Sequence, residues 1–140
     1  MQWIKTTMVG GLVGACQVPQ TASLPPTRFM LKCGAPNGSG IPTAAKAGFE
    51  ITANQATNSF SAPWWRKGEW PIASVRPDKV VLLDYHVDHG MDGNPEEYRI
   101  TFDIHTRTLQ YFEAYSALFP TKNQFSAHCD LIPLASGGAN

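Results

Sequence analysis

The chain carries few charges and no excess of either sign. Charged residues make up 16% of its 140 residues, and 11 lysines and arginines are balanced by 11 aspartates and glutamates. A balanced chain has no general electrostatic attraction to nucleic acids, anionic membranes or polycations. We therefore expect no nucleic-acid partner.

The sequence also lacks long apolar runs. No run approaches the roughly 20 apolar residues of a membrane-spanning helix, which argues against an integral membrane protein. The 11 prolines and 12 glycines favour turns and short strands over long helices. A chain of 140 residues has room for one domain with a substantial core.

Cysteine is scarce, and the three cysteines divide the chain. Cys16 ends a short uncharged run, residues 8–15, whereas Cys33 and Cys129 lie near the two ends of the segment with strand patterns. With Cys16 set aside, an even pair remains for one disulfide.

The amino terminus has the order of a secretory signal peptide. One cation, Lys5, precedes the apolar run, and small residues stand before Cys16. The segment Val13-Gly14-Ala15-Cys16 resembles the lipobox of bacterial lipoproteins. The resemblance implies that residues 1–15 are a signal peptide and that Cys16 is acylated and anchors the protein to a membrane. The alternative is a cytosolic tail with an ordinary cysteine.

The residues after Cys16 fit a tether. Residues 16–27 are polar with three prolines, a composition that stays extended. We expect a flexible tether at 16–27, a β domain at 28–134 and a disordered tail at 135–140. Gln17 stands where lipoproteins kept at the inner membrane have aspartate. The resemblance therefore implies the periplasmic side of the cell envelope, with an outer-membrane anchor.

Short segments with period-two alternation recur from residue 28 onward. They predict an all-β fold, a small antiparallel barrel or sandwich of seven to eight short strands with one disulfide. A tight turn is expected at Thr106-Arg107 and a single helical turn at 43–47. The expected strands are 29–33, 49–52, 58–62, 72–75, 80–87, 98–105, 108–115 and 125–131.

Cys33 and Cys129 each share a strand face with apolar residues, so both sulfurs are expected in the core. A disulfide between them would join the first and last strands and contribute about 4–5 kcal/mol in the chain-entropy model. The alternative is two buried thiols in a cytosolic protein. A zinc site lacks the usual close cysteine spacing.

The densest group of potential metal ligands is the His/Asp cluster at Asp84–Asp92. His86 and Asp88 share a strand face and His89 starts the next loop, so these three are candidate metal ligands. The alternative is the solvated end of a strand and its hairpin loop. The loop does not have the spacing of an EF-hand calcium site.

A tryptophan-rich segment, residues 63–71, has the most binding character. Trp64, Trp65, Arg66 and Trp70 could form an aromatic platform for stacking or cation–π contacts. The alternative is a loop whose indoles plug one end of the barrel.

No catalytic motif is found, since no Gly-x-Ser-x-Gly elbow occurs and Glu96-Glu97 is expected in a solvated loop. The pattern from Phe29 to Cys129 resembles small bacterial envelope lipoproteins that carry no assigned activity. The order of segments, with a lipobox, a tether and a small β barrel that has an early and a late cysteine, is also similar to that of membrane-bound C-type lysozyme inhibitors. Their inhibitory loop motif is missing here. We expect a non-enzymatic envelope lipoprotein that needs no cofactor and binds a protein or glycan, with metal binding or lysozyme inhibition as alternatives.

Overall fold

The computed structural model of the protein describes residues 24–89, 93–116 and 120–135. These residues form ten strands and one turn of 3-10 helix, Thr43–Ala45. None of them belongs to a helix that is long and apolar enough to cross a membrane. The predicted all-β fold class and the short helical turn are confirmed.

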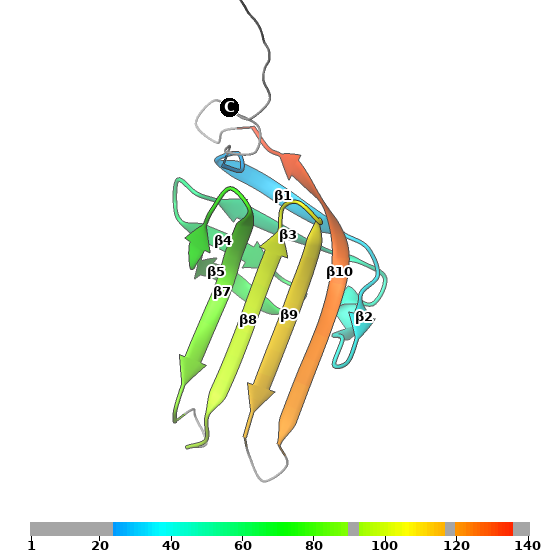
Figure 1. The fold of residues 1–140 in the computed structure, drawn as a ribbon, viewed down its shortest axis with the longest axis vertical. Helices are drawn as coiled ribbons and strands as arrows, with labels where there is room; N and C mark the ends of the chain where they lie inside the picture. The colour runs from blue at the N-terminus through cyan, green and yellow to red at the C-terminus, as the bar shows by residue number, and fades with distance from the viewer. Residues whose placement is uncertain (1–23, 90–92, 117–119, 136–140) are drawn as a thin grey trace, which may run out of the picture.

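All strands pair antiparallel in one curled sheet of order β5-β4-β3-β1-β10-β9-β8-β7-β6, with β2 paired to β10 off this path (Figure 1). The strands are β1 (Arg28–Cys33), β2 (Asn37–Gly38), β3 (Phe49–Asn54), β4 (Ser59–Ala62), β5 (Arg66–Pro71), β6 (Ser74–Val75), β7 (Lys79–Val87), β8 (Glu96–Asp103), β9 (Thr108–Tyr115) and β10 (Thr121–Pro133).

The longest strand, β10, takes part in two layers of the curled sheet. Its first part, Thr121–His128, pairs with β9, and its last part, Cys129–Pro133, pairs with β1. In Figure 1, β7–β10 lie in front, and β1, β3, β4 and β5 cross behind their upper halves. The lower halves of β7–β10 therefore project beyond the rear layer.

The core lies between the two layers. Its residues are those that the alternation along each strand turns inward. In β8, for example, Tyr98, Ile100 and Phe102 are buried, and the residues between them are half-buried on the other face. Burial of one large apolar side chain contributes roughly 1.5–3 kcal/mol. The largest side chains with less than 2% exposure are Phe29, Phe60, Phe102 and Phe125.

A register shift in β7 changes which of its residues face inward. Val80 and Leu82 are buried, but the shift between Val81 and Leu83 makes Leu83 the partner of Ile100. Because a bulge adds one residue to the alternation, the later odd-numbered residues turn inward. Tyr85 thereby lies opposite Tyr98 on the concave face.

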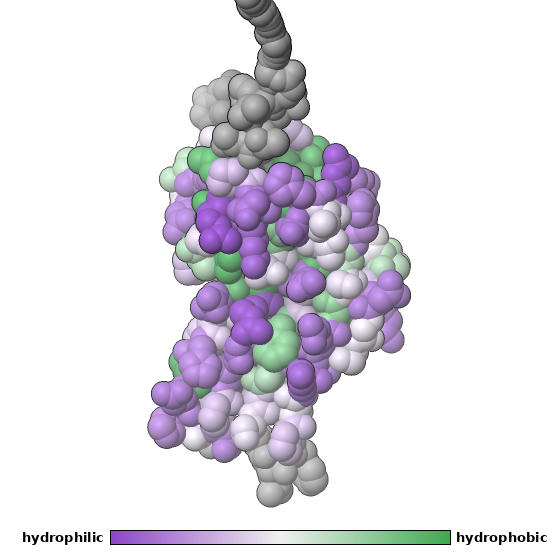
Figure 2. Space-filling view, viewed as in Figure 1, coloured by the Kyte–Doolittle hydropathy of each residue, from purple (hydrophilic) through white to green (hydrophobic). Residues whose placement is uncertain are grey.

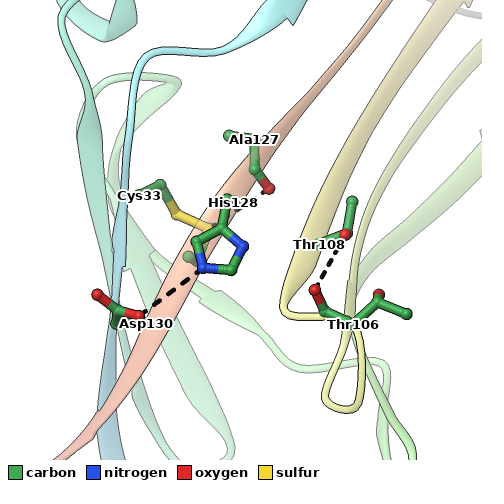
Figure 3. Close-up of a disulfide and its surroundings, with 7 residues drawn as sticks. Cys33, Thr106, Thr108, Ala127, His128 and Asp130 are labelled. Carbon is green, nitrogen blue, oxygen red and sulfur yellow. Dashed lines mark hydrogen bonds and ion pairs between the residues drawn. A yellow bond between two sulfur atoms is a disulfide. The ribbon is translucent and has the colours of Figure 1, made fainter.

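Cys33 and Cys129 are register partners on β1 and β10 and form a disulfide. Figure 3 shows the bond running from Cys33 to β10, close to His128 and Asp130 on that strand. Cys33 is 6% exposed and Cys129 is 0% exposed, so the bond lies in the core. The predicted link between the opening and closing strands is confirmed.

The hairpin between β8 and β9 is held by one carboxylate. The backbone N–H groups of His105 and Thr106 both donate to Asp103 Oδ1 at 2.9 Å. These bonds, that from Thr106 first, hold the pKa of Asp103 below its ordinary value. Arg107 has a positive φ of 56°, as a tight turn requires, so the predicted turn is confirmed.

Two local expectations are corrected. Residues 66–71, expected as part of a loop, form β5, and Glu96-Glu97, expected in a loop, begins β8. Neither segment alternates between apolar and polar residues, and each is held as a strand by its partner's backbone. Eight strands have four or more residues, which agrees with the expected count, and β2 and β6 are two-residue additions.

The outward face of β7–β10 is mainly hydrophilic, as Figure 2 shows. Arg99 pairs there with Glu97, and its guanidinium lies 4.5 Å from the ring centroid of Phe112. Hydrophobic residues are scattered on this face, so it has the ordinary character of a solvated surface.

We expect the disulfide to supply a large share of the stability. The double variant Cys33→Ala/Cys129→Ala should lose about 4 kcal/mol of unfolding free energy, because the bond closes a loop with a sequence separation of 96 residues. Urea denaturation with and without dithiothreitol measures this loss. The variant should not respond to the reductant, and an unchanged midpoint for reduced wild-type protein would contradict the prediction.

Candidate functional site

Four rows of side chains cross the concave face of β7–β10, and their chemistry changes from top to bottom. The two upper rows are almost wholly apolar and lie in the core: Val80, Phe102, Leu109, Ala127, then Leu83, Ile100, Tyr111, Phe125. The two lower rows combine aromatic, acidic and polar residues: Tyr85, Tyr98, Glu113, Asn123, then Val87, Glu96, Tyr115, Thr121.

An open cleft of about 520 Å³ lies over this lower part of the sheet. Its opposite wall comes from Pro42 and the Trp64–Arg66 turn that precedes and begins β5. All four tyrosines of the chain stand in the rows described above. The cleft is lined by Pro42, Trp64, Trp65, Arg66, Glu96, Tyr98, Tyr111, Glu113 and Tyr115.

The predicted tryptophan segment divides into a buried part and an accessible part. Trp64 is 8% exposed and packs on Phe49, Tyr111 and Phe125, with ring centroids 4.5–6.1 Å apart. Trp65 and Trp70 are half-buried and contact each other at 5.2 Å. Trp64 therefore serves as a plug, whereas Trp65 and Trp70 offer ring surface beside the cleft.

Burial leaves two indole N–H groups without an acceptor in the described part of the chain, those of Trp64 and Trp70. An unpaired buried donor costs roughly 1–3 kcal/mol.

Arg66 is held against aromatic faces. Its guanidinium carbon lies 4.8 Å from the ring centroid of Trp65 and 4.9 Å from that of Tyr98. The same residues, together with Trp70, Leu83 and Tyr85, line a smaller hollow of about 160 Å³ next to the cleft. Cation–π contacts of this kind contribute about 0.5–1 kcal/mol at exposed sites.

Two tyrosine–glutamate pairs form the floor of the cleft. The Tyr111 hydroxyl donates to Glu113 Oε1 at 2.8 Å, and the Tyr98 hydroxyl donates to Glu96 Oε1 at 3.5 Å. Desolvation, followed by the neighbouring glutamate, raises the pKa of both tyrosines above the ordinary value of 10. Both hydroxyls are therefore neutral donors, and they orient the carboxylates without cancelling their charge.

The wall residues lie close to the tyrosines of the floor. The Trp65 ring centroid is 6.4 Å from that of Tyr98, and the Arg66 guanidinium lies 4.9 Å from the Tyr98 ring centroid. Trp65 lowers the pKa of Tyr111 and Arg66 lowers that of Tyr98, but each effect is smaller than the rise caused by burial. The wall is thus in contact with the floor at Tyr98.

The predicted metal ligands lie elsewhere. His86 Nε2 is 3.1 Å from Asp88 Oδ1, and both side chains are more than half exposed. His89 is exposed too, and the last acid of the cluster, Asp92, lies outside the described residues. Among residues 24–89, 93–116 and 120–135, no three His, Cys, Asp or Glu side chains are grouped so that they could hold a metal ion.

A larger hollow, about 640 Å³, lies over β1 and β3. It is lined largely by small residues and by outward-facing polar residues such as Lys32 and Glu50. Its aromatic residues, Phe49 and Trp64, are at least nine-tenths buried. It therefore lacks the accessible rings and inward carboxylates of the cleft.

The sequence interpretation found the tryptophan wall but missed the floor. Glu96, Tyr98, Tyr111, Glu113 and Tyr115 alternate along β8 and β9 at inward positions. The available signal was a polar or charged residue at a position where the alternation predicts a core residue. The lipidation candidate Cys16 lies outside the described residues.

The chain matches no protein-family model, no curated protein and no solved structure. The geometry of the cleft and the composition of the chain are therefore the basis for the functional argument.

We expect stability to fall at alkaline pH through the buried tyrosines. Because the folded-state pKa of Tyr98 and of Tyr111 is raised, their contribution is complete below about pH 10 and is lost as the pH rises above it. Urea denaturation at about pH 8 and about pH 11 should show a smaller alkaline loss for Tyr111→Phe than for the wild type. Equal losses would contradict the assignment.

Proposed function

We propose that the protein is a non-enzymatic lipoprotein of the cell envelope whose β domain binds a glycan in the cleft of about 520 Å³ over the lower halves of β7–β10. The observation that carries the proposal is the change in the inward-facing rows, from apolar residues to tyrosine, glutamate, asparagine and threonine. A core would continue with apolar residues, whereas a polar ligand site would not.

A saccharide fits this set of side chains. A sugar ring has apolar C–H faces that stack on aromatic rings, and its edge carries hydroxyls that require hydrogen-bond partners. Trp65 and Tyr115, both half-buried, supply rings, and Glu96 and Glu113 supply acceptors that tyrosine hydroxyls already orient. An open cleft lined by aromatic and polar side chains also suits an extended polar chain better than it suits a compact apolar ligand.

The two acids of the cleft are placed to accept hydrogen bonds. Glu96 and Glu113 project from adjacent strands on the same face of the sheet, since Glu96 is the register partner of Tyr115 and Glu113 that of Tyr98. Each carboxylate already accepts a hydrogen bond from a tyrosine hydroxyl and keeps further acceptor sites for the hydroxyls of a sugar.

The envelope address rests on the amino-terminal resemblance and on the disulfide. Structural disulfides persist in oxidising compartments outside the cytoplasm. β1 begins beside the end of β10, near the top of the domain in Figure 1, whereas the uncovered halves of β7–β10 are at the bottom. An anchor attached through residue 16 would therefore join the domain at the end opposite the cleft.

The lipid anchor is tested by mass spectrometry of protein purified from its native host. We expect cleavage before Cys16 and a mass increase of several acyl chains, which together hold a protein firmly at a membrane. The Cys16→Ala variant should move to the soluble fraction. An unmodified chain that still begins at Met1 would overturn the lipoprotein part of the proposal.

Glycan binding is tested by calorimetric titration with short chito-oligosaccharides, acetylated and deacetylated. Trp65→Ala should weaken binding by about thirtyfold, or roughly 2 kcal/mol, as expected for an accessible aromatic anchor. Phe112→Ala on the outward face removes a ring of the same class and should bind like the wild type. If wild-type protein binds neither oligosaccharide, glycan binding is wrong.

A further inference from the structure

We propose that the sugar unit held over β8 and β9 carries a protonated amine, as an amino sugar with a free amine does. This inference rests on the glycan-binding function proposed above and specifies the chemistry of its ligand. It follows from the charge of the cleft floor and from the rings around it.

Glu113 is a half-buried carboxylate on the concave face. It accepts a hydrogen bond from the Tyr111 hydroxyl and forms no ion pair with any described residue. That hydroxyl is neutral, and among the residues that the structure describes it is the one side-chain donor to the Glu113 carboxylate. Partial burial of a charge is costly unless it is paired, so a cation from the ligand would offset this cost.

The cation that lines the cleft does not pair with Glu113. Among the described residues of the lining, Arg66 is the only cationic one, and its guanidinium lies over the rings of Trp65 and Tyr98. It forms no ion pair with Glu113. A positive charge on the ligand would therefore complement the Glu113 carboxylate.

The aromatic rings around the cleft can bind a cation, since two of them already contact the guanidinium of Arg66. Arg66 lies over the rings of Trp65 and Tyr98 at 4.8 Å and 4.9 Å, which occupies those two faces. Tyr115 is two residues after Glu113 on β9 and faces the same side of the sheet. It is half-buried and lines the cleft. An amine placed there would combine a charge-assisted hydrogen bond with a cation–π contact.

The test compares acetylated and deacetylated chito-oligosaccharides of equal length on the full-length protein. The titration is done at about pH 6, where an amine of the α-amino class is protonated. Wild-type protein should bind the deacetylated form about tenfold more tightly, because a charge-assisted hydrogen bond is roughly twice as strong as a neutral one. Glu113→Gln keeps the shape of the side chain and should bring the ratio of the two affinities close to one, whereas a ratio that stays near ten would overturn the inference.

Glu69→Gln is the matched control, since it makes the same charge change at an exposed residue on β5. It should keep the wild-type preference. If wild-type protein binds both sugars equally, glycan binding stands and the inference is wrong. If Glu69→Gln loses the preference as Glu113→Gln does, the selectivity comes from overall charge and the inference is also wrong.

Discussion

The position of the cleft depends on β10, which is longer than any strand of the rear layer. β10 pairs with β9 through its first eight register positions and with β1 through its last five. It bends from one layer into the other, so the rear layer meets the front layer only over part of its length. The disulfide between Cys33 and Cys129 joins β1 and β10 within the part that pairs with the rear layer.

This mismatch in length divides the concave face into two environments. Where the rear layer covers the sheet, water is excluded and large apolar side chains such as Phe102 and Phe125 contribute most. Beyond the rear layer the same face stays wet, and tyrosine and glutamate can be accommodated there. The boundary falls near Tyr111, whose ring stacks on Phe125 at 4.7 Å while its hydroxyl reaches Glu113.

The rigidity of the cleft comes from residues that belong to both environments. Trp64 is anchored in the core, and its neighbours Trp65 and Arg66 contact Tyr98 of the floor. A wall fixed in this way loses little conformational entropy when a ligand binds. The aromatic segment is thus both part of the core and part of the proposed binding surface.

Strand alternation in the sequence predicted the fold class, most strand positions and the Thr106-Arg107 turn, and it placed Cys33 and Cys129 in the core, where the disulfide was expected once Cys16 was set aside. These features follow from local rules, since period two sets the face of each side chain and parity sets the cysteine pair. β5 was missed because its residues, Arg66–Pro71, show no alternation and are held in place by β4.

The tertiary structure alone decided which inward-facing residues are core and which line a cleft. Glu96, Glu113 and Tyr115 have the same periodicity as Ile100 and Leu109, and the extent of the rear layer separates the two groups. The shift at Val81 that brings Tyr85 to the same face also has no signature in the sequence. The extent of the rear layer and the register of the strands depend on contacts between strands that are distant in sequence. A local sequence pattern carries no information on these contacts.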